Sequence, residues 1–172
     1  MKKVPLSATT SFYRNPEQLA VVVAWLHAVV AARGAVSAHV FAQSSGQETW
    51  TLLFEVHRAG LLEHVTISAS DVRPEAVLAA RKAVYGKDEV SAVPLDVRTG
   101  GFGKVAAGYK VRNVLRSRVR HKQIDIGCMP AVGPFDLILC QNVLVHMEQN
   151  EAEQVLANIA KVQAPGGLLA LG

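Results

Sequence analysis

The feature that most restricts the fold of this chain is an alternation of short apolar segments with segments of helical spacing after residue 37. The segments SAHVFAQ (37–43), HVTISAS (64–70) and FDLILCQNV (135–143) have the length and apolar content of buried strands. Strands that alternate with helices pair in parallel and are covered on both faces. The pattern therefore predicts an α/β protein with a parallel sheet.

Helices are predicted before and between these strands. The first, over 15–34, has Asn15 as its N-cap, Pro16 at its first position and Gly34 just past its end. The other predicted elements are helices over 46–62, 71–86 and 150–162 and strands over 118–126 and 168–172.

Length and composition favour one globular domain. The chain has 172 residues, of which 50% are hydrophobic and 19% charged. Cys128 and Cys140 fit a reducing compartment and have no metal-ligand spacing, so no metal site is expected. No apolar core of a signal peptide follows the first residues MKK, and the apolar run 19–32 is too short to span a bilayer. We therefore expect a cytoplasmic protein with no membrane insertion.

The positive charge of the chain is concentrated in one stretch. Eight lysines and arginines and no acidic residue lie between Arg98 and Lys122. This basic stretch predicts either an acidic partner or a solvated face. Nucleic acid is not the expected partner, because no aromatic residues are interleaved with the basic ones in a recognition motif. The segment 87–110 has little periodicity and is predicted to leave the main sheet.

The loop AQSSG (42–46) after the first predicted strand suggests a ligand. It has one glycine, whereas loops that bind a pyrophosphate usually have several. Asp71 ends the next strand, 25 residues after Gly46, where a carboxylate can accept hydrogen bonds from a ribose diol. A nucleoside without phosphates fits this pair, and S-adenosylmethionine is the common ligand of that kind.

Five segments, in the same order, resemble motifs of the CheR-type chemotaxis receptor methyltransferases. TSFYRNP resembles Thr-x-Phe-Phe-Arg-x-Pro, and AQSSGQETWTL resembles Gly-Cys-Ser-Thr-Gly-Glu-Glu-x-Tyr-Ser-Leu. ISASDVRPEAVLAARKAVY resembles Ile-x-Ala-Thr-Asp-Ile-Asp followed by Leu-x-x-Ala-Arg-x-Gly-x-Tyr. GPFDLILCQNVLVHM is very close to Gly-Pro-Phe-Asp-Leu-Ile-x-Cys-Arg-Asn-Val-Leu-Ile-Tyr-Phe, and APGGLLALG resembles Pro-Gly-Gly-x-Leu-x-Leu-Gly. The resemblance covers nearly the whole chain.

The resemblance implies a Rossmann-like class I methyltransferase sheet that uses S-adenosylmethionine. It divides the chain into an N-terminal segment and helix (1–36) and a methyltransferase-like domain (37–172). A small basic insertion over about 87–118 would correspond to the β-subdomain with which the family can bind receptors. The last helix and strands of a complete methyltransferase sheet are missing from the sequence. An open strand edge would result, which is explained by a boundary of the segment, by a gene remnant or by a second copy that covers the edge; self-association as a homodimer is the hypothesis that we carry forward.

The implied activity is methyl transfer from S-adenosylmethionine to glutamate side chains of chemotaxis receptors. By this resemblance, Arg14 and His146 lie at the transferred methyl group. The cofactor is bound by residues of four loops: Gly46 and Glu48, Asp71, Asp125 and Ile126, and Asn142 and Val143. The basic stretch would bind the acidic helices of the receptor.

Each of these residues also has a purely structural interpretation. Arg14 is explained as a surface charge, Glu48 as a first-turn acid that favours the helix dipole, and Asp71 as a helix N-cap. Residues 138–145 are explained as a core strand.

The chain also departs from the family at several pocket positions. Ala42 and Gln43 replace Gly-Cys, Gln47 replaces a glutamate, Arg73 an acid, Gln141 an arginine and His146 a tyrosine. A second hypothesis is therefore a weak or inactive relative that binds S-adenosylmethionine or a signalling partner. A third, less favoured one is a methyltransferase that acts on another substrate, such as RNA.

Overall fold

The computed structural model describes residues 10–128 and 132–172, so the MKK start lies outside the described residues. Its main sheet contains five parallel strands in the order β6-β2-β1-β7-β8. These strands are β1 (Val36–Val40), β2 (Val65–Asp71), β6 (Val119–Gln123), β7 (Phe135–Cys140) and β8 (Gln163–Leu171). The predicted parallel α/β sheet is thereby confirmed.

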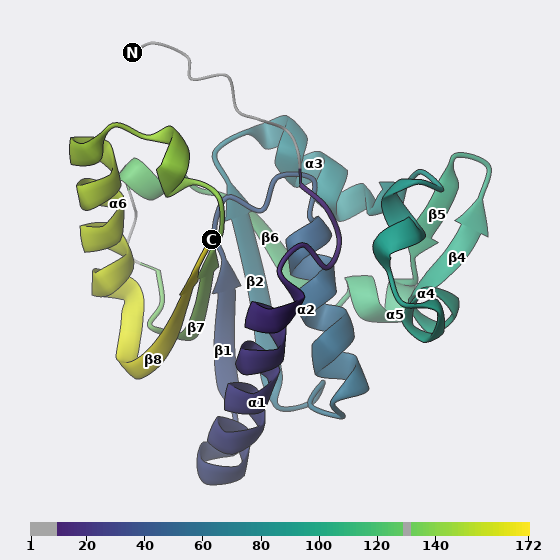
Figure 1. The fold of residues 1–172 in the computed structure, drawn as a ribbon, viewed down its shortest axis with the longest axis horizontal. Helices are drawn as coiled ribbons and strands as arrows, with labels where there is room; N and C mark the ends of the chain where they lie inside the picture. The colour runs from purple at the N-terminus through teal and green to yellow at the C-terminus, as the bar shows by residue number, and fades with distance from the viewer. Residues whose placement is uncertain (1–9, 129–131) are drawn as a thin grey trace.

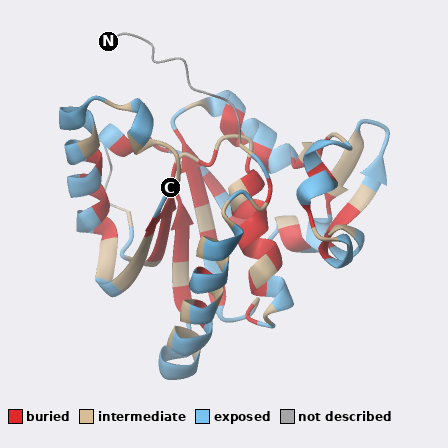
Figure 2. Cartoon of the chain, viewed as in Figure 1, coloured by how far each residue is buried: buried red, intermediate tan, exposed pale blue. Residues whose placement is uncertain are grey.

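Four helices pack on this sheet (Figure 1): α1 (Pro16–Arg33), α2 (Gln47–Arg58), α3 (Pro74–Lys82) and α6 (Gln149–Val162). Alternation along the strands separates two cores. Leu137 and Leu139 of β7 join the core under α1 and α2, whereas Ile138 and Cys140 join the core under α6. Figure 2 shows that α2 is largely buried, whereas α1 and α6 keep exposed outer faces.

The segment between α3 and β6 leaves the main sheet, as predicted, and forms a small antiparallel sheet of its own. This sheet has the order β3-β5-β4 and projects from the side of the molecule in Figure 1. Its strands are β3 (Val84–Tyr85), β4 (Phe102–Val105) and β5 (Gly108–Val111), and short helices flank it: η1 (Glu89–Ala92), α4 (Leu95–Gly101) and α5 (Asn113–Arg116). The pattern of the sequence predicts the excursion but not these elements, because each is only two to seven residues long.

A cluster of aromatic rings joins the N-terminal segment to the small sheet. The ring of Phe12 is 1% exposed, and its centroid lies 4.9 Å from that of Tyr85 and 5.7 Å from that of Phe102. It also stacks on Phe54 of α2 at 6.4 Å. Buried aromatic contacts of this kind fix the approach of the chain to α1. They therefore also fix the position of Arg14.

Several predicted caps and ends of helices and strands differ from the structure. Gly34 ends α1 in the left-handed conformation as expected, but Asn15 makes no capping bond with its side chain; its amide instead donates to Gln141 Oε1 at 2.7 Å. The predicted helix 71–86 ends at Lys82, because Val84 and Tyr85 pair with β5. Strand β8 begins at Gln163, before the predicted 168, and a register shift opposite Phe135 and Leu137 accommodates its glycines.

No helix among the described residues is both long and apolar enough to cross a membrane.

Candidate functional site

The predicted site residues gather at the carboxyl edge of the main sheet. The chain passes from β1 to β2 and then to β6 on one side, and continues with β7 on the other side of β1. The direction of strand order thus reverses at β1. In open parallel sheets, ligands bind beyond the carboxyl ends of the strands at such a switch point. The loops that carry Gly46, Asp71, Asp125 and Asn142 follow β1, β2, β6 and β7 respectively, so the topology brings all four to this edge.

The loop after β1 has an unusual backbone. Ala42 and Ser44 adopt φ values of 50° and 52°, and Gly46 has φ 97°. A β-carbon on Gly46 would lie 2.9 Å from the β-carbon of Ala80, so glycine is required there both by conformation and by space. The backbone N–H of Gln43 donates to Ser70 O at 2.9 Å, and the Tyr85 hydroxyl donates to Ser45 O at 2.7 Å. These bonds hold a strained loop against β2 and the small sheet.

Asp71 lies directly beside this loop. Its side chain is 3% exposed, and Oδ2 accepts a hydrogen bond from the backbone N–H of Ser44 at 2.8 Å. Oδ1 accepts from the backbone N–H of Arg73 at 3.0 Å and from Arg73 Nε at 3.1 Å. A carboxylate offers about four acceptor sites, and three of them are used here. Asp71 thus keeps one acceptor site unused, and Arg73 occupies one of its oxygens.

Glu48 stands in the first turn of α2 with a buried oxygen. Its Oε1 is sealed from solvent and has no hydrogen-bond partner among the described residues, although the residue as a whole keeps partial exposure. Burial raises the pKa of Glu48 to about 8, and the charge of Arg14 opposes that shift. Burial likewise raises the pKa of the nearby Cys140 thiol to about 12, with a further contribution from the charge of Glu48. The structure therefore brings Arg14, Glu48 and the end of β7 together.

An acceptor that is buried without a donor fits an ammonium-bearing ligand. Among the predicted cofactor residues, Glu48 is the one with a buried oxygen that lacks a hydrogen-bond donor. Burying a carboxylate oxygen without a donor lowers the stability of the fold. The amino group of S-adenosylmethionine would supply the missing donor.

The remaining predicted residues line the same edge with different exposure. Asp125 is exposed, and its Oδ1 accepts from the backbone N–H of Gly127 at 2.8 Å. Ile126 is buried in the core under α6. Asn142 has φ 53°, and Val143 packs against that same core. Asn142 is thus held in a sparsely populated conformation at the end of β7, as residues of binding loops often are.

The two predicted catalytic residues are both exposed and come from different ends of the chain. Arg14 precedes α1, and His146 ends the short helix η3 (Leu144–His146). Asn15, next to Arg14, is bonded to Gln141 at the start of the loop that carries His146. The N-terminal segment is therefore attached to the loop after β7.

Two buried residues behind the loop were not predicted as site residues. Gln43 and His121 are 1% and 8% exposed, and Gln43 Oε1 lies 2.9 Å from His121 Nδ1. This contact assigns the proton to Nδ1, and burial lowers the pKa of His121 to about 4. The contact supports the loop from β6. The only feature of the sequence that could have indicated this contact is the polar residue Gln43 next to a predicted buried strand.

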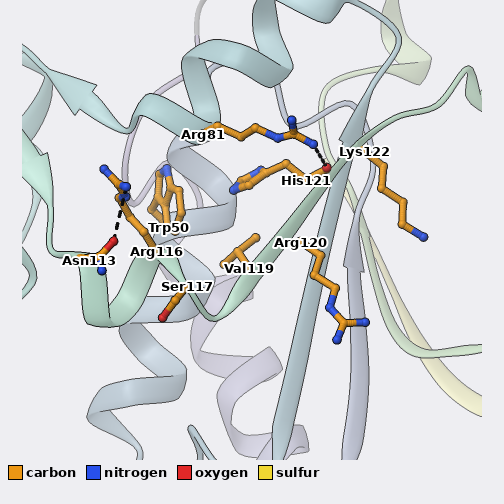
Figure 3. A pocket seen from close by; sticks show the side chains of 9 residues that line it. All are labelled: Trp50, Arg81, Asn113, Arg116, Ser117, Val119, Arg120, His121 and Lys122. Atoms are coloured by element: carbon orange, nitrogen blue, oxygen red, sulfur yellow. Dashed lines mark hydrogen bonds between the residues drawn. The ribbon is translucent and has the colours of Figure 1, made fainter.

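Two cavities, of about 430 and 200 Å³, lie among the described residues, and none of the predicted cofactor residues lines either of them (Figure 3 shows the larger). Within residues 10–128 and 132–172, no group of three His, Cys, Asp or Glu side chains is arranged to hold a metal ion.

Comparison with known sequences gives a match over almost the whole chain. A family model described as CheR methyltransferase, SAM binding domain, matches residues 8–172. The chain is 30% identical over 139 residues to chemotaxis protein methyltransferase 1 of Vibrio cholerae, covering 76% of this chain and 50% of that protein. It is 26% identical over 133 residues to the probable biofilm formation methyltransferase WspC of Pseudomonas aeruginosa, covering 75% of this chain and 32% of WspC. The chain thus spans a third to a half of the length of these relatives.

Solved structures give the same fold at lower identity. SAM-bound CalS10, an amino pentose methyltransferase from Micromonospora echinaspora, superposes with a TM-score of 0.53 at 16% identity, covering 90% of this chain and 48% of that one. The glycopeptide N-methyltransferase MtfA in complex with SAM gives a TM-score of 0.51 at 14% identity, covering 87% and 48%. These likenesses confirm the predicted Rossmann-like fold.

Proposed function

The chain belongs to the CheR methyltransferase family, and from this premise we propose that it transfers a methyl group from S-adenosylmethionine to glutamate side chains of chemotaxis-type receptors. The family and the cofactor predicted from the sequence are confirmed by the matched domain. The glutamate substrate, the receptor and the roles of individual residues are proposals. The cytoplasmic location and the homodimer also stay predictions.

The observation that carries the proposal is the buried, unpaired Oε1 of Glu48 beneath a strained loop that touches Asp71. In the proposed complex, Glu48 accepts from the amino group of the cofactor and Asp71 from its ribose. Gly46 allows close approach of the loop backbone. Asp125 and Ile126 contact the adenine, and Asn142 and Val143 complete the wall after β7.

The chemistry needs little from the protein beyond placement. When bound, S-adenosylmethionine supplies an electrophilic methyl group on a positively charged sulfur. A carboxylate oxygen forms the new bond to that carbon as the carbon–sulfur bond breaks, and the electron pair stays on sulfur. Glutamate is already ionised at neutral pH, so no proton moves and no general base is needed. Arg14 would orient the substrate carboxylate, and His146 would border the methyl group.

Recognition of the receptor is proposed to use the basic stretch. Lys104 and Arg112 belong to the small sheet and its flank and are exposed, as an acidic helix would require. Complementary charge of this kind mainly accelerates association and weakens with salt.

The proposal is tested by methyl transfer to a glutamate-rich receptor peptide. A methyl ester releases methanol in alkali, so base-labile label from methyl-labelled S-adenosylmethionine identifies the product. The matched control is the same peptide with glutamines in place of glutamates. Label that is stable to alkali, or equal transfer to the control peptide, would contradict the proposal.

A weak or inactive module that binds S-adenosylmethionine or a signalling partner is the second candidate. The pairing of Arg73 with Asp71 favours it, because Arg73 occupies an oxygen that the ribose would use. Thermal unfolding with S-adenosylhomocysteine separates the two. Ligand at 100 times its dissociation constant should stabilise the fold by about 2.7 kcal/mol. Stabilisation without methyl transfer supports the module. Transfer supports the enzyme.

A further inference from the structure

Arg14 lies in a short turn between two fixed points of the chain. The ring of Phe12 is buried in the aromatic cluster, and α1 begins at Pro16. Besides Arg14, only Tyr13 and Asn15 lie between these points. Ordering a turn costs conformational entropy, so a turn that presents one side chain in one place needs contacts of its own. The two neighbours of Arg14 supply such contacts.

Tyr13 binds the turn to α2. Its backbone is in the left-handed region, with φ 53°, which is uncommon for a residue other than glycine. Its N–H donates to Thr51 Oγ1 at 3.2 Å, and its hydroxyl donates to Glu55 Oε1 at 2.8 Å. Burial and the charge of Glu55 raise the pKa of Tyr13, so the hydroxyl keeps its proton and remains a donor. These two bonds hold a backbone conformation that is otherwise sparsely populated.

The carboxylate of Glu55 is itself held in place. Its Oε1 also accepts from Arg58 Nη1 at 2.9 Å, and Arg58 Nε lies 3.5 Å from Asp96 Oδ2. These contacts run from the turn through α2 to α4, which flanks the small sheet. The family motif Thr-x-Phe-Phe-Arg-x-Pro has phenylalanine at the position of Tyr13, so the hydroxyl contact distinguishes this chain from the motif.

Asn15 binds the turn to the other side of the site. Its Nδ2 donates to Gln141 Oε1 at 2.7 Å. The amide of Gln141 donates in turn to Gln18 Oε1, and Gln18 Nε2 donates to Leu171 O at 2.6 Å. Three amide side chains thus join the start of α1 to the ends of β7 and β8. Gln141 directly precedes Asn142, so this network includes the loop that carries part of the predicted cofactor wall.

The place of Arg14 matters to the site because its charge acts on Glu48. This charge opposes the rise in pKa that burial causes at Glu48, and the same carboxylate acts on the Cys140 thiol of β7. The interaction of two charges weakens with distance, so a displaced Arg14 would act less on Glu48.

We propose that Tyr13 and Asn15 are positioning residues, which hold Arg14 over the candidate site through their hydrogen bonds to Glu55 and Gln141. The inference rests on the proposed role of Arg14 toward the substrate carboxylate. It adds that this role requires both hydrogen bonds, although neither Tyr13 nor Asn15 is proposed to touch substrate or cofactor. A displacement of about 1 Å can cost an enzyme roughly a hundredfold in rate, so contacts beside the site can decide its activity.

The pKa of Glu48 in the free protein reports the place of Arg14 without cofactor or substrate. Carbon-13 NMR follows the glutamate carboxyl groups through a pH titration, and Glu48→Gln identifies the signal. Arg14→Gln should raise this pKa further, and Tyr13→Phe and Asn15→Ala should each raise it to a smaller extent. In the Arg14→Gln background the two neighbouring changes should have no effect, because the charge that they position is gone.

Glu55 provides a second comparison. Glu55→Ala and Glu55→Gln remove the same charge, but glutamine keeps an oxygen that accepts from the Tyr13 hydroxyl. The pKa of Glu48 should therefore be higher in Glu55→Ala than in Glu55→Gln. Equal values would contradict a positioning role of Tyr13.

Two matched controls lie elsewhere in the chain. Tyr109→Phe removes a hydroxyl from β5, and Gln154→Ala removes an amide bond to Asn158 within α6. Both should leave the pKa of Glu48 as in the parent, and thermal unfolding shows whether each variant folds. If Tyr13→Phe and Asn15→Ala also leave it unchanged, the proposal is overturned.

Steady-state methyl transfer gives a second readout. Tyr13→Phe and Asn15→Ala should each lower kcat by roughly tenfold and change KM for S-adenosylmethionine by less than about twofold. An inactive parent whose variants show the expected pKa changes would refute the proposed function and support the positioning. An active parent whose variants keep both kcat and the pKa of Glu48 would refute the positioning alone.

Discussion

At the scale of single residues, Glu48 is expected to destabilise the free protein and to strengthen ligand binding. Its pKa is about 8 in the folded chain, against a reference value of 4.5. The folded state therefore holds a proton that the unfolded state has lost, and the resulting destabilisation grows as the pH rises from 4.5 to 8. Ligand binding would recover this cost, since an ammonium group favours the ionised carboxylate.

Glu48→Gln is therefore predicted to stabilise the free protein and to abolish its response to ligand. We expect the free energy of unfolding at pH 8 to rise by about 1–3 kcal/mol, with little change at pH 4.5. The stabilisation by S-adenosylhomocysteine should disappear. Chemical denaturation at both pH values, with and without ligand, measures both effects. A variant that keeps the ligand response would show that Glu48 does not bind the amino group.

Arg73 is expected to compete with the ribose for Asp71. Arg73→Ala removes the bond from Nε to Oδ1 and frees an acceptor. The freed oxygen could accept a hydrogen bond from the ribose, and such a bond at a partly exposed site contributes about 1 kcal/mol. The affinity for S-adenosylhomocysteine should therefore rise by roughly fivefold. Arg118→Ala, which breaks an ion pair with Glu63 outside the site, is the matched control and should leave affinity unchanged. Weaker binding by Arg73→Ala would mean that Arg73 orients Asp71 for the ligand.

At the scale of elements, the N-terminal segment depends on one aromatic anchor. Phe12→Ala removes a ring that contacts Phe54, Tyr85 and Phe102, and should lower the free energy of unfolding by about 3–5 kcal/mol. Because Arg14 lies two residues further on, the affinity for S-adenosylhomocysteine should fall as well. Phe12→Leu keeps most of the volume and should lose less of both. Denaturation and ligand titration of the two variants check this; equal behaviour would contradict an anchoring role.

The sequence predicts well those helices and strands whose own residues carry an apolar pattern or a characteristic end residue. The main strands and α1 have apolar patterns within their own length. Gly34 predicts the end of α1, because glycine readily adopts the left-handed conformation of a helix C-cap. The hairpin of β4 and β5 has strands of only four residues, rich in glycine and lysine. Its stability depends on Phe12 and Phe54, which are far away in the sequence.

The same distinction holds for the candidate site. Gly46 and Asp71 are predicted to meet because the carboxyl ends of neighbouring parallel strands lie together. The pairing of Asp71 with Arg73 depends on a side-chain conformation, and Gln43 meets His121 across 78 positions of the sequence. Neither contact has a periodic signal, so the structure is needed to find it.

At the scale of the whole molecule, the sheet is covered unevenly. Helices α2 and α3 contact β2, and α3 contacts β6. On the other face of these two strands, Thr66, Arg120 and Lys122 are exposed. A sheet with one solvated face alternates buried and exposed residues, as β6 does. His39 lies on this second face but is sealed by Phe41 and Phe135.

This buried histidine should make the fold sensitive to acid. Its ring nitrogens lie 2.7 Å from Ser68 Oγ and 2.9 Å from Ser70 Oγ, and burial, together with the charge of Lys122, lowers its pKa to about 3. The unfolded chain binds the proton near pH 6.5, so the stability that His39 contributes above that pH is lost as the pH falls from 6.5 to 3. Between pH 7 and pH 5 the loss should be about 2 kcal/mol.

Glu48 changes stability in the opposite direction over the same range, so the total pH dependence of the parent chain is not diagnostic. The difference between parent and variant isolates His39. His39→Gln keeps polar partners for the two serines and has no proton to gain, so it should lose about 2 kcal/mol less than the parent between pH 7 and pH 5. His27→Gln, at an exposed position of α1, should follow the parent. Urea denaturation at the two pH values measures each difference. Parallel losses in all three proteins would mean that His39 is protonated without cost in the folded state.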